Sequence, residues 1–297
     1  MMVAGASRPA HVEPRWEDNW MERRRKGNGE VMTPSVSDKW GAGANYDEFM
    51  GRWSRALAPR FVSWLRVAKS TRWLDVGCGT GALTSAICEH ADPETVLGCD
   101  PAAPLIGYAR RQVHDVRASF VVAGVGSLPP HVKGYGSVAS LFALNFFPDA
   151  DAAIDEQRSL AVAEGTISAC VWDYARGMMF LRYFWDVAAT VDPGAREFDE
   201  AGRFPVCSPN KLVNLFEKAG LCDVRCEPIE IPTEFRSFDD YWQPFLGGTG
   251  PAPSYVASLD AHRRSALAAK LVRTLPTRSN GVIALTGLAW AVRGTVQ

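Results

Sequence analysis

The chain has 297 residues, 47% of them hydrophobic, and a formal net charge of −1 at pH 7. This composition supports one good core and a small second lobe, and the mixed charges do not favour a nucleic-acid or acidic-lipid partner. No apolar run approaches a membrane span, and the N-terminus lacks the apolar core of a signal peptide, so we expect a cytoplasmic protein. The seven cysteines form no C-x-x-C pair, and we expect no metal site.

The N-terminal segment differs from the rest of the chain. Residues 1–40 show no sustained hydrophobic periodicity and carry a charged run at 22–26. We expect a disordered extension, with a basic tail for nucleic acid as the alternative. Residues 41–297 are expected to form one domain, which begins with helical periodicity over 46–67 interrupted by Pro59.

The middle of the chain alternates short apolar runs with amphipathic segments. Such an alternation predicts an α/β fold with a parallel, doubly wound sheet and right-handed crossovers. The expected strands are 72–77, 95–100, 119–123, 136–142 and 165–172, and the expected helices are about 81–90, 103–113 and 150–162.

The last third of the chain is expected to hold two helices, two strands and a long insertion. One helix begins at the pair Ser208-Pro209 and stops at Gly220, an arrangement typical of a serine N-cap, a proline at N1 and a glycine at C′. The other elements are a helix at 178–190, strands at 222–231 and 283–292, and an aromatic-rich insertion at 233–280 with a glycine hinge at 247–251.

The most informative segment is Arg72–Thr84, where an apolar strand runs directly into three glycines at alternate positions. Because they lack a Cβ, Gly77, Gly79 and Gly81 allow a tight turn and let a ligand approach the main chain. Nineteen residues after Gly81, a second apolar segment ends in Asp100. An acid at that distance lies at the tip of the neighbouring parallel strand, where it can bind a ribose diol. The sequence therefore predicts a nucleoside-binding site.

Two kinds of nucleoside are compatible with this loop. The spacing Gly77-x-Gly79-x-x-Ala82 is a loose dinucleotide fingerprint, which would indicate a nicotinamide-dependent oxidoreductase. Asp75 disfavours a pyrophosphate, because its carboxylate would repel one. S-adenosylmethionine (SAM) carries a sulfonium and an ammonium and no phosphate. The Gly-x-Gly-x-Gly pattern with Asp75 resembles motif I of the class I SAM-dependent methyltransferases, in which this acid helps to hold the methionine ammonium group.

The resemblance extends from about Tyr46 to Val292 and is to small-molecule methyltransferases related to the quinone-biosynthesis C-methyltransferases. It is carried by the glycine motif and by three further segments, 45–54, 128–129 and 143–149. It implies a seven-stranded, mostly parallel sheet with an antiparallel last strand, SAM as cofactor and a small-molecule methyl acceptor. Helical and aromatic lid elements are expected at about 44–67, 178–206 and 233–280.

The resemblance also implies which residues bind the cofactor. Tyr46 and Arg52 would lie near the methionine end, Asp100 would bind the ribose, and the segment after the third strand would meet the adenine. The full set is Tyr46, Arg52, Asp75, Gly77, Gly79, Thr80, Gly81, Asp100, Pro101, Val125, Gly126 and Leu141.

Methyl transfer needs no fixed catalytic triad, because the sulfonium already activates the carbon. If the acceptor needs a base, Asp173 after the fifth strand is the first candidate, with a turn cap as its alternative role. Asn145 and Phe146 are expected to face the methyl group or the acceptor. The aromatic side chains of 180–185 and 241–245 are expected to be mostly core, with a subset lining an apolar acceptor cavity.

Two positions depart from the family pattern. Val125 stands where the family usually has an acid or amide that reaches the adenine, which removes one hydrogen bond worth roughly 0.5–1.5 kcal/mol. Gly136 replaces the acid that commonly opens the fourth strand, and the turn before the fifth strand is eroded to Ala163-Glu-Gly165. These departures leave open a non-catalytic SAM-fold binding or regulatory protein as the alternative.

Overall fold

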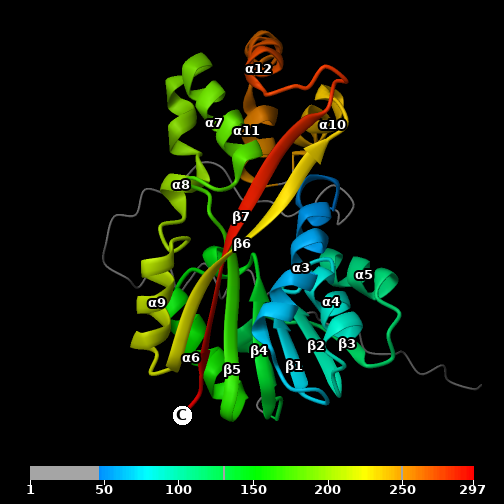
Figure 1. Cartoon of the computed structure of the whole chain (residues 1–297), viewed down its shortest axis with the longest axis vertical. Coiled ribbons are helices and arrows are strands. Elements are labelled where there is room, and N and C mark those ends of the chain that lie inside the picture. Colours follow the sequence, from blue (N-terminus) through cyan, green and yellow to red (C-terminus); the bar gives the residue numbers. More distant parts are fainter. Residues whose placement is uncertain (1–46, 130, 249) are drawn as a thin grey trace, which may run out of the picture. The chain divides into compact units, whose positions relative to one another are not determined.

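The computed structural model describes residues 47–129, 131–248 and 250–297, all within the compact unit Val36–Gln297. The expected extension at 1–40 and Tyr46 lie outside the described residues. Seven strands form one sheet in the order β3-β2-β1-β4-β5-β7-β6 (Figure 1). They are β1 (Arg72–Val76), β2 (Thr95–Asp100), β3 (Ala118–Val122), β4 (Tyr135–Leu141), β5 (Ala161–Trp172), β6 (Cys222–Phe235) and β7 (Ile283–Thr295).

Strands β3, β2, β1, β4 and β5 are parallel to one another, and β7 is antiparallel to both β5 and β6. The expected mostly parallel sheet with a reversed last strand is therefore confirmed. The helices are α3 (Arg52–Leu65), α4 (Ala82–His90), α5 (Ala103–Gln112), α6 (Ala150–Leu160), α7 (Met179–Val191), α8 (Glu200–Arg203), α9 (Pro209–Lys218), α10 (Phe238–Trp242), α11 (Pro251–Ser258) and α12 (Ala261–Thr274). Shorter helical turns are η1 (Asp47–Gly51), η2 (Val125–Ser127), η3 (Leu144–Phe146), η4 (Pro193–Glu197) and η5 (Gln243–Gly247).

The direction of winding changes between β1 and β4. The chain passes from β1 outward to β3 and then returns to β4 on the other side of β1. Because parallel crossovers are right-handed, α4 and α5 cover one face of the sheet and α6 covers the other. Ligands of such sheets bind outside the carboxyl ends of the strands at this switch point, which is where the glycine segment follows β1.

Among the helices of the described residues, none has the length and apolar character that a membrane span requires.

Three local expectations differ from the structure. The proline at 59 does not interrupt α3, because buried side chains such as Leu57 and Phe61 hold the helix together across it. Strand β5 begins at Ala161 rather than 165, since Ala161 pairs with Tyr135 of β4 and Glu164 donates its N–H to the Val296 carbonyl. Ser208 precedes α9 as expected, but its hydroxyl donates to the Pro205 carbonyl and does not cap the helix.

The β6–β7 hairpin continues beyond the carboxyl edge of the parallel strands. Strand β5 ends where Trp172 pairs with Ala289, whereas β6 and β7 remain paired as far as Phe235 and Ile283. In Figure 1 this extension rises above the parallel strands, with α7 on one side and α10 on the other. One face of the extension is buried and includes Thr233, and the other face is exposed. The hairpin thus carries the insertion over the edge where a ligand would bind.

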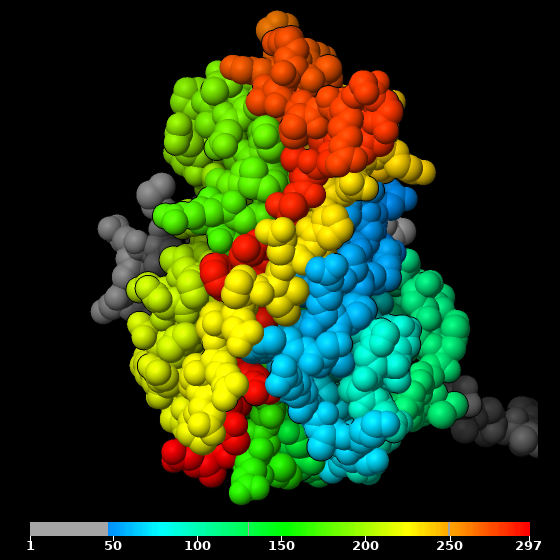
Figure 2. All heavy atoms as spheres, viewed as in Figure 1, coloured from blue at the N-terminus to red at the C-terminus, as the bar shows by residue number. Residues whose placement is uncertain are grey.

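The outer edge of the sheet is protected at β6. Pro228 and Pro232 lie on this edge strand and lack the N–H that would pair with another strand. Helix α3 covers the same strand: Arg60 donates to the Glu230 carbonyl, and the Trp64 indole N–H donates to Glu227 at 2.9 Å. Figure 2 shows α3 in blue lying against β6 in yellow, with β7 in red visible only in patches.

Candidate cofactor and acceptor site

The glycine loop turns sharply between β1 and α4. Gly77, Gly79 and Gly81 have φ values of 71°, 52° and 86°, a region that favours glycine. A Cβ on Gly77 would lie 2.4 Å from the Cβ of Ala143, and one on Gly81 would lie 2.9 Å from Val113. A Cβ on Gly79 would meet no heavy atom of the described residues within 4 Å. Packing therefore requires the first and third glycines, whereas the second faces open space where a ligand can approach the main chain.

Asp100 fastens this loop to the tip of β2. One carboxylate oxygen accepts the Gly79 N–H at 3.0 Å, and the other accepts the Ala102 N–H at 2.8 Å. Burial raises the pKa of Asp100, and these two amide donors oppose the rise. Each oxygen retains a second lone pair, so the oriented carboxylate can also accept ribose hydroxyls.

Asp75 lies fully buried in β1, beneath the loop. The Thr84 hydroxyl donates to its Oδ2 atom at 2.6 Å, and Oδ1 has no hydrogen-bond partner among the described residues. Burial raises the pKa of Asp75 to about 7. A nearby cation would favour the charged form, so the environment of this carboxyl fits a positively charged ligand group. Sequence reasoning missed Thr84, whose signal is a hydroxyl in the first turn of α4, nine residues after Asp75.

Arg52 lies against the insertion. Its guanidinium pairs with Asp240 at 3.1 Å and lies over the rings of Trp53 and Phe235, at 4.3 and 4.5 Å from their centroids. These contacts join α3 to β6 and α10. A role near the methionine end of a cofactor stays a prediction.

The two positions expected around the adenine differ in their surroundings. Val125 is buried in the core, whereas a Cβ on Gly126 would meet only the flexible end of Glu156, whose carboxylate oxygen would lie 2.4 Å away. A Cβ on Gly136 would lie 2.7 Å from the Thr71 methyl group, so the departure at this position follows from close packing. Of the other expected contacts, Thr80 and Leu141 are buried and Pro101 is exposed.

Asn145 lies just beyond β4, in η3. Its residue exposure is 8%, and neither its Nδ2 nor its Oδ1 atom has a hydrogen-bond partner in the described part of the chain. The strand ends in a strained residue, because Phe142 has a φ of 58° while its ring stacks on Trp172 at 4.1 Å. Strain of this kind costs on the order of 1–3 kcal/mol and is common at functional sites. The stretch from Phe142 to Asn145 thus combines backbone strain with an unpaired buried amide.

Asp173 follows β5 and caps the turn that leads to α7. Its carboxylate accepts the Arg176 N–H at 2.9 Å and the Trp290 indole N–H at 3.3 Å. The capping role considered from the sequence is therefore present in the structure. A role as a base stays a prediction.

Most aromatic side chains of α7 and of the insertion pack as core. Phe180, Phe184 and Tyr241 are almost fully buried, and the Tyr241 hydroxyl donates to the Phe180 carbonyl at 2.8 Å. Phe204 is also buried, and its ring centroid lies 5.0 Å from that of Phe146 and 5.5 Å from that of Tyr174. These three rings link the end of α8 to the segments that follow β4 and β5. Sequence periodicity did not single out Phe204, which lies between α8 and α9 and outside either helix.

A buried acid holds α8 in place. Glu200 is 2% exposed and accepts a hydrogen bond from the Trp185 indole N–H of α7. Next to it, Asp199 pairs with Arg182. Burial raises the pKa of Glu200 to about 7, and the charge of Asp199 adds to the rise while Arg182 opposes it.

We expect Glu200→Gln to stabilise the protein at pH 8 and to have little effect at pH 5. The pKa of Glu200 is about 7 in the folded protein and 4.5 in the unfolded chain. The protonated carboxyl therefore contributes to folding stability in full below pH 4.5, and this contribution is lost as the pH rises through about 7. The shift corresponds to roughly 3 kcal/mol, and glutamine keeps the acceptor for Trp185. Thermal melts between pH 5 and 8 measure the effect, with exposed Glu197→Gln as the control. Parallel pH profiles for the two variants would contradict the prediction.

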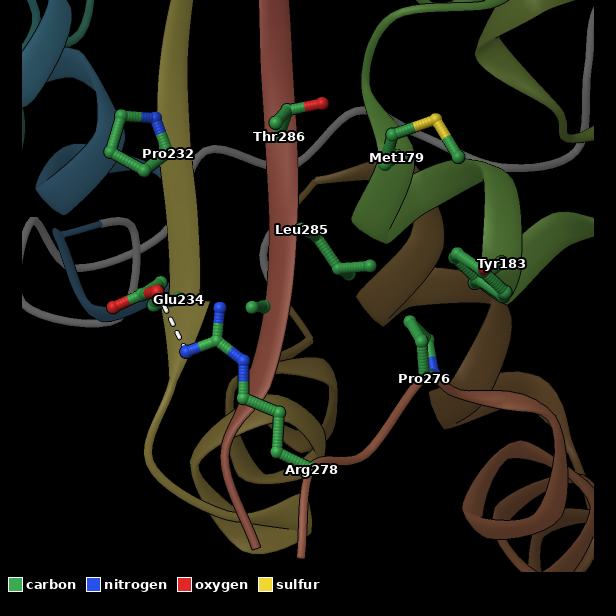
Figure 3. A pocket seen from close by; sticks show the side chains of 9 residues that line it. Met179, Tyr183, Pro232, Glu234, Pro276, Arg278, Leu285 and Thr286 are labelled. Atoms are coloured by element: carbon green, nitrogen blue, oxygen red, sulfur yellow. Dashed lines mark ion pairs between the residues drawn. The ribbon is translucent and has the colours of Figure 1, made fainter. Parts of the chain in front are cut away.

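A separate hollow of about 470 Å³ lies on the exposed side of the hairpin extension. Figure 3 shows Met179 and Tyr183 of α7 facing Leu285 of β7, with Pro276 below them. Arg278 reaches across β7 and pairs with Glu234 of β6 at 3.6 Å. None of the residues that line the hollow belongs to the glycine loop or to the tip of β2, so the hollow is distinct from the candidate site.

Comparison with known proteins identifies one domain. Residues 74–165 match a family model described as a methyltransferase domain, and this stretch runs from β1 into β5. No curated protein matches the chain. In the described residues, no cluster of three or more His, Cys, Asp or Glu side chains could hold a metal ion.

Solved structures share the fold at low sequence identity. A Bacillus halodurans protein described as a methyltransferase matches with a TM-score of 0.52 and 12% identity, over 81% of this chain and 98% of its own. An Anabaena variabilis protein described as a methyltransferase from an antibiotic biosynthesis pathway gives 0.54 and 17%, over 80% and 98%. Phosphoethanolamine N-methyltransferase 2 of Haemonchus contortus, solved with phosphomonomethylethanolamine and S-adenosylhomocysteine, gives 0.53 and 13%, over 86% and 57%. The sheet is that of class I methyltransferases.

Proposed function

We propose that this protein is a SAM-dependent methyltransferase that acts on a small-molecule acceptor. The observation that carries the proposal is the joint between the glycine loop and Asp100. Gly79 presents an uncovered main chain, and its N–H fixes the carboxylate at the tip of β2. This arrangement suits a nucleoside whose ribose hydroxyls donate to Asp100 while the rest of the ligand lies across the main chain at Gly79. The match of residues 74–165 to a methyltransferase domain supports the choice of nucleoside.

The charges of the site favour SAM over a dinucleotide. Asp75 lies buried below the loop with one oxygen unpaired, an arrangement that fits an ammonium group and opposes a pyrophosphate. When bound, SAM supplies a methyl group activated by its sulfonium. The residues of the chain bind and orient the two partners: Asp100 would hold the ribose, Asp75 the cationic end, and the hairpin extension would exclude water above them.

Binding and turnover together test the proposal. Titration calorimetry with SAM, S-adenosylhomocysteine and NADH should give heat with the first two ligands and none with NADH. Incubation with isotopically labelled SAM and fractionated metabolite extracts should then yield a product carrying the labelled methyl group. Heat with NADH alone would support an oxidoreductase and overturn the proposal.

The buried position of Val125 favours one second candidate, a non-catalytic SAM-binding or regulatory protein. An apolar side chain there gives the adenine no polar partner, and this loss weakens binding by up to about tenfold. Binding of SAM in the calorimeter, together with no transfer of the labelled methyl group to any metabolite of a broad extract, would favour this candidate.

A further inference from the structure

We propose that the hollow on the exposed side of the hairpin extension binds a flat aromatic carboxylate, and that Arg278 holds the carboxylate group. This site is separate from the cofactor site, so the inference goes beyond the proposed methyl transfer and does not depend on it. It is drawn from the cavity itself and from two side chains that line it, Tyr183 and Arg278, to which the described residues offer no ring partner and no hydrogen bond.

The hollow has the size and lining of a small-molecule site. Its volume of about 470 Å³ lies within the range of roughly 300–1,000 Å³ that is usual for ligand pockets. Met179 and Tyr183 of α7 face Leu285 of β7 across the hollow (Figure 3). Pro276 lies below them. Because these side chains come from opposite sides, a flat ligand placed between them would be covered on both faces.

Tyr183 differs from the other aromatic side chains of α7. Phe180, Phe184 and Trp185 are almost fully buried, and each packs against another ring. Tyr183 is half-buried and forms neither a ring pair nor a side-chain hydrogen bond with any described residue. Aromatic rings gain from offset and edge contacts with other rings, beyond the area that they bury. A flat ring in the hollow would supply this contact.

Arg278 supplies a positive charge at the rim of the hollow. Its guanidinium pairs with Glu234 at 3.6 Å, which is beyond hydrogen-bond distance, and it forms no hydrogen bond with the described residues. The planar fork of N–H donors is therefore available for a carboxylate, which it can bind through two parallel hydrogen bonds. The segment 261–278 that leads to it contains five Arg or Lys residues and no acid, so the local field attracts an anion.

Glu234 competes with such a ligand for Arg278. Its carboxylate repels an anion in the hollow and holds the guanidinium only through a loose, exposed pair. The proposal therefore makes opposite predictions for the two charged residues. Removal of the charge at Arg278 should weaken binding of the carboxylate, and removal of the charge at Glu234 should strengthen it.

The test titrates wild type and variants with three probes by saturation-transfer NMR. They are 2-naphthoate, its neutral amide 2-naphthamide, and the saturated decalin-2-carboxylate of similar size. We expect wild type to bind 2-naphthoate at least about threefold more tightly than either other probe. Arg278→Gln should weaken binding of 2-naphthoate about tenfold, and Glu234→Gln should strengthen it about threefold. Tyr183→Leu should abolish the preference for the flat over the saturated carboxylate.

The control is Arg263→Gln, which removes the same charge from α12 at a residue that does not line the hollow. The side chains of Arg263 and Arg278 are 58% and 59% exposed, so the two variants are matched in exposure. We expect the control to change binding of 2-naphthoate by less than about twofold. Each variant should keep its Tm within about 3 °C of wild type, because the altered side chains are at least partly exposed.

Each other outcome overturns the inference. Equal binding of 2-naphthoate and 2-naphthamide would show that the hollow does not recognise a carboxylate. An equal loss in Arg263→Gln and Arg278→Gln would assign the effect to the general field of α12. Binding that is unchanged in Arg278→Gln and Tyr183→Leu would place the probe elsewhere on the protein. The affinity for S-adenosylhomocysteine should be the same in all these proteins, and its absence would overturn the proposed function without affecting this site.

Discussion

Replacing Gly77 with alanine is expected to unfold the glycine loop, while replacing Gly79 is expected to spare the fold and block the ligand. The new methyl group at position 77 would sit 2.4 Å from the Ala143 Cβ, on a backbone with a φ of 71°. The conformation costs about 1–2 kcal/mol and overpacking a further 1–3 kcal/mol. The Tm should therefore fall by roughly 5–15 °C.

The Gly79→Ala variant provides the matched comparison. Its methyl group enters open space, so only the strain of a φ of 52° opposes folding, and the Tm should fall by about 2–6 °C. Binding of S-adenosylhomocysteine should nevertheless weaken by more than tenfold, because the methyl group occupies the space in which the ligand meets the main chain. The double variant Gly77→Ala, Ala143→Gly should recover part of the lost Tm. Equal binding by Gly79→Ala and wild type would show that the ligand does not cross this loop.

The sheet was predictable because its signals are local. Strands β1, β2, β4 and β5 are each followed by a turn and a helix, whereas β3 leads to β4 through the short turn η2. The observed strands begin and end within a few residues of the expected ones. Asp100 could be placed at the tip of the strand next to the glycine turn, since successive strands of a βαβ unit are parallel and both end at the same edge of the sheet. The spacing of Gly81 and Asp100 therefore predicted that the glycine loop lies next to the end of β2. The hydrogen bond from the Gly79 N–H to Asp100 shows this contact.

The rest of the site depends on contacts between distant segments. No sequence pattern indicates that Arg52 pairs with Asp240, 188 positions along the chain. The unpaired state of Asn145 is likewise invisible in sequence, because it depends on which partners the fold brings near. Glu200 looks like an ordinary surface acid at the start of a helix until α7 packs over it. The length of β5 was misjudged for the same reason, since its first residues are held by the pairing of Ala161 with Tyr135 and by the hydrogen bond from Glu164 to Val296.

Asp100→Asn is expected to weaken SAM binding about 10- to 100-fold while leaving the protein folded. Asparagine retains one oxygen and so can accept the N–H of only one of Gly79 and Ala102, where the carboxylate accepts both. The ribose also loses a charge-assisted hydrogen bond, worth about 1.5–3 kcal/mol. Titration calorimetry with S-adenosylhomocysteine measures the change. Asp260→Asn serves as the control, because it removes the same charge at the start of α12 and asparagine is an equally good N-cap.

The pH dependence of binding separates a direct role of Asp100 from a structural one. Burial raises the pKa of this carboxyl in the free protein, and a ribose diol that donates to the charged form would lower it again. Affinity for S-adenosylhomocysteine should therefore fall as pH drops through the raised pKa of Asp100, and the Asp100→Asn variant should lose the part of this slope that comes from Asp100. If asparagine weakened binding but left the slope unchanged, the carboxylate would act only by holding the loop, and the sugar of the ligand would lie elsewhere.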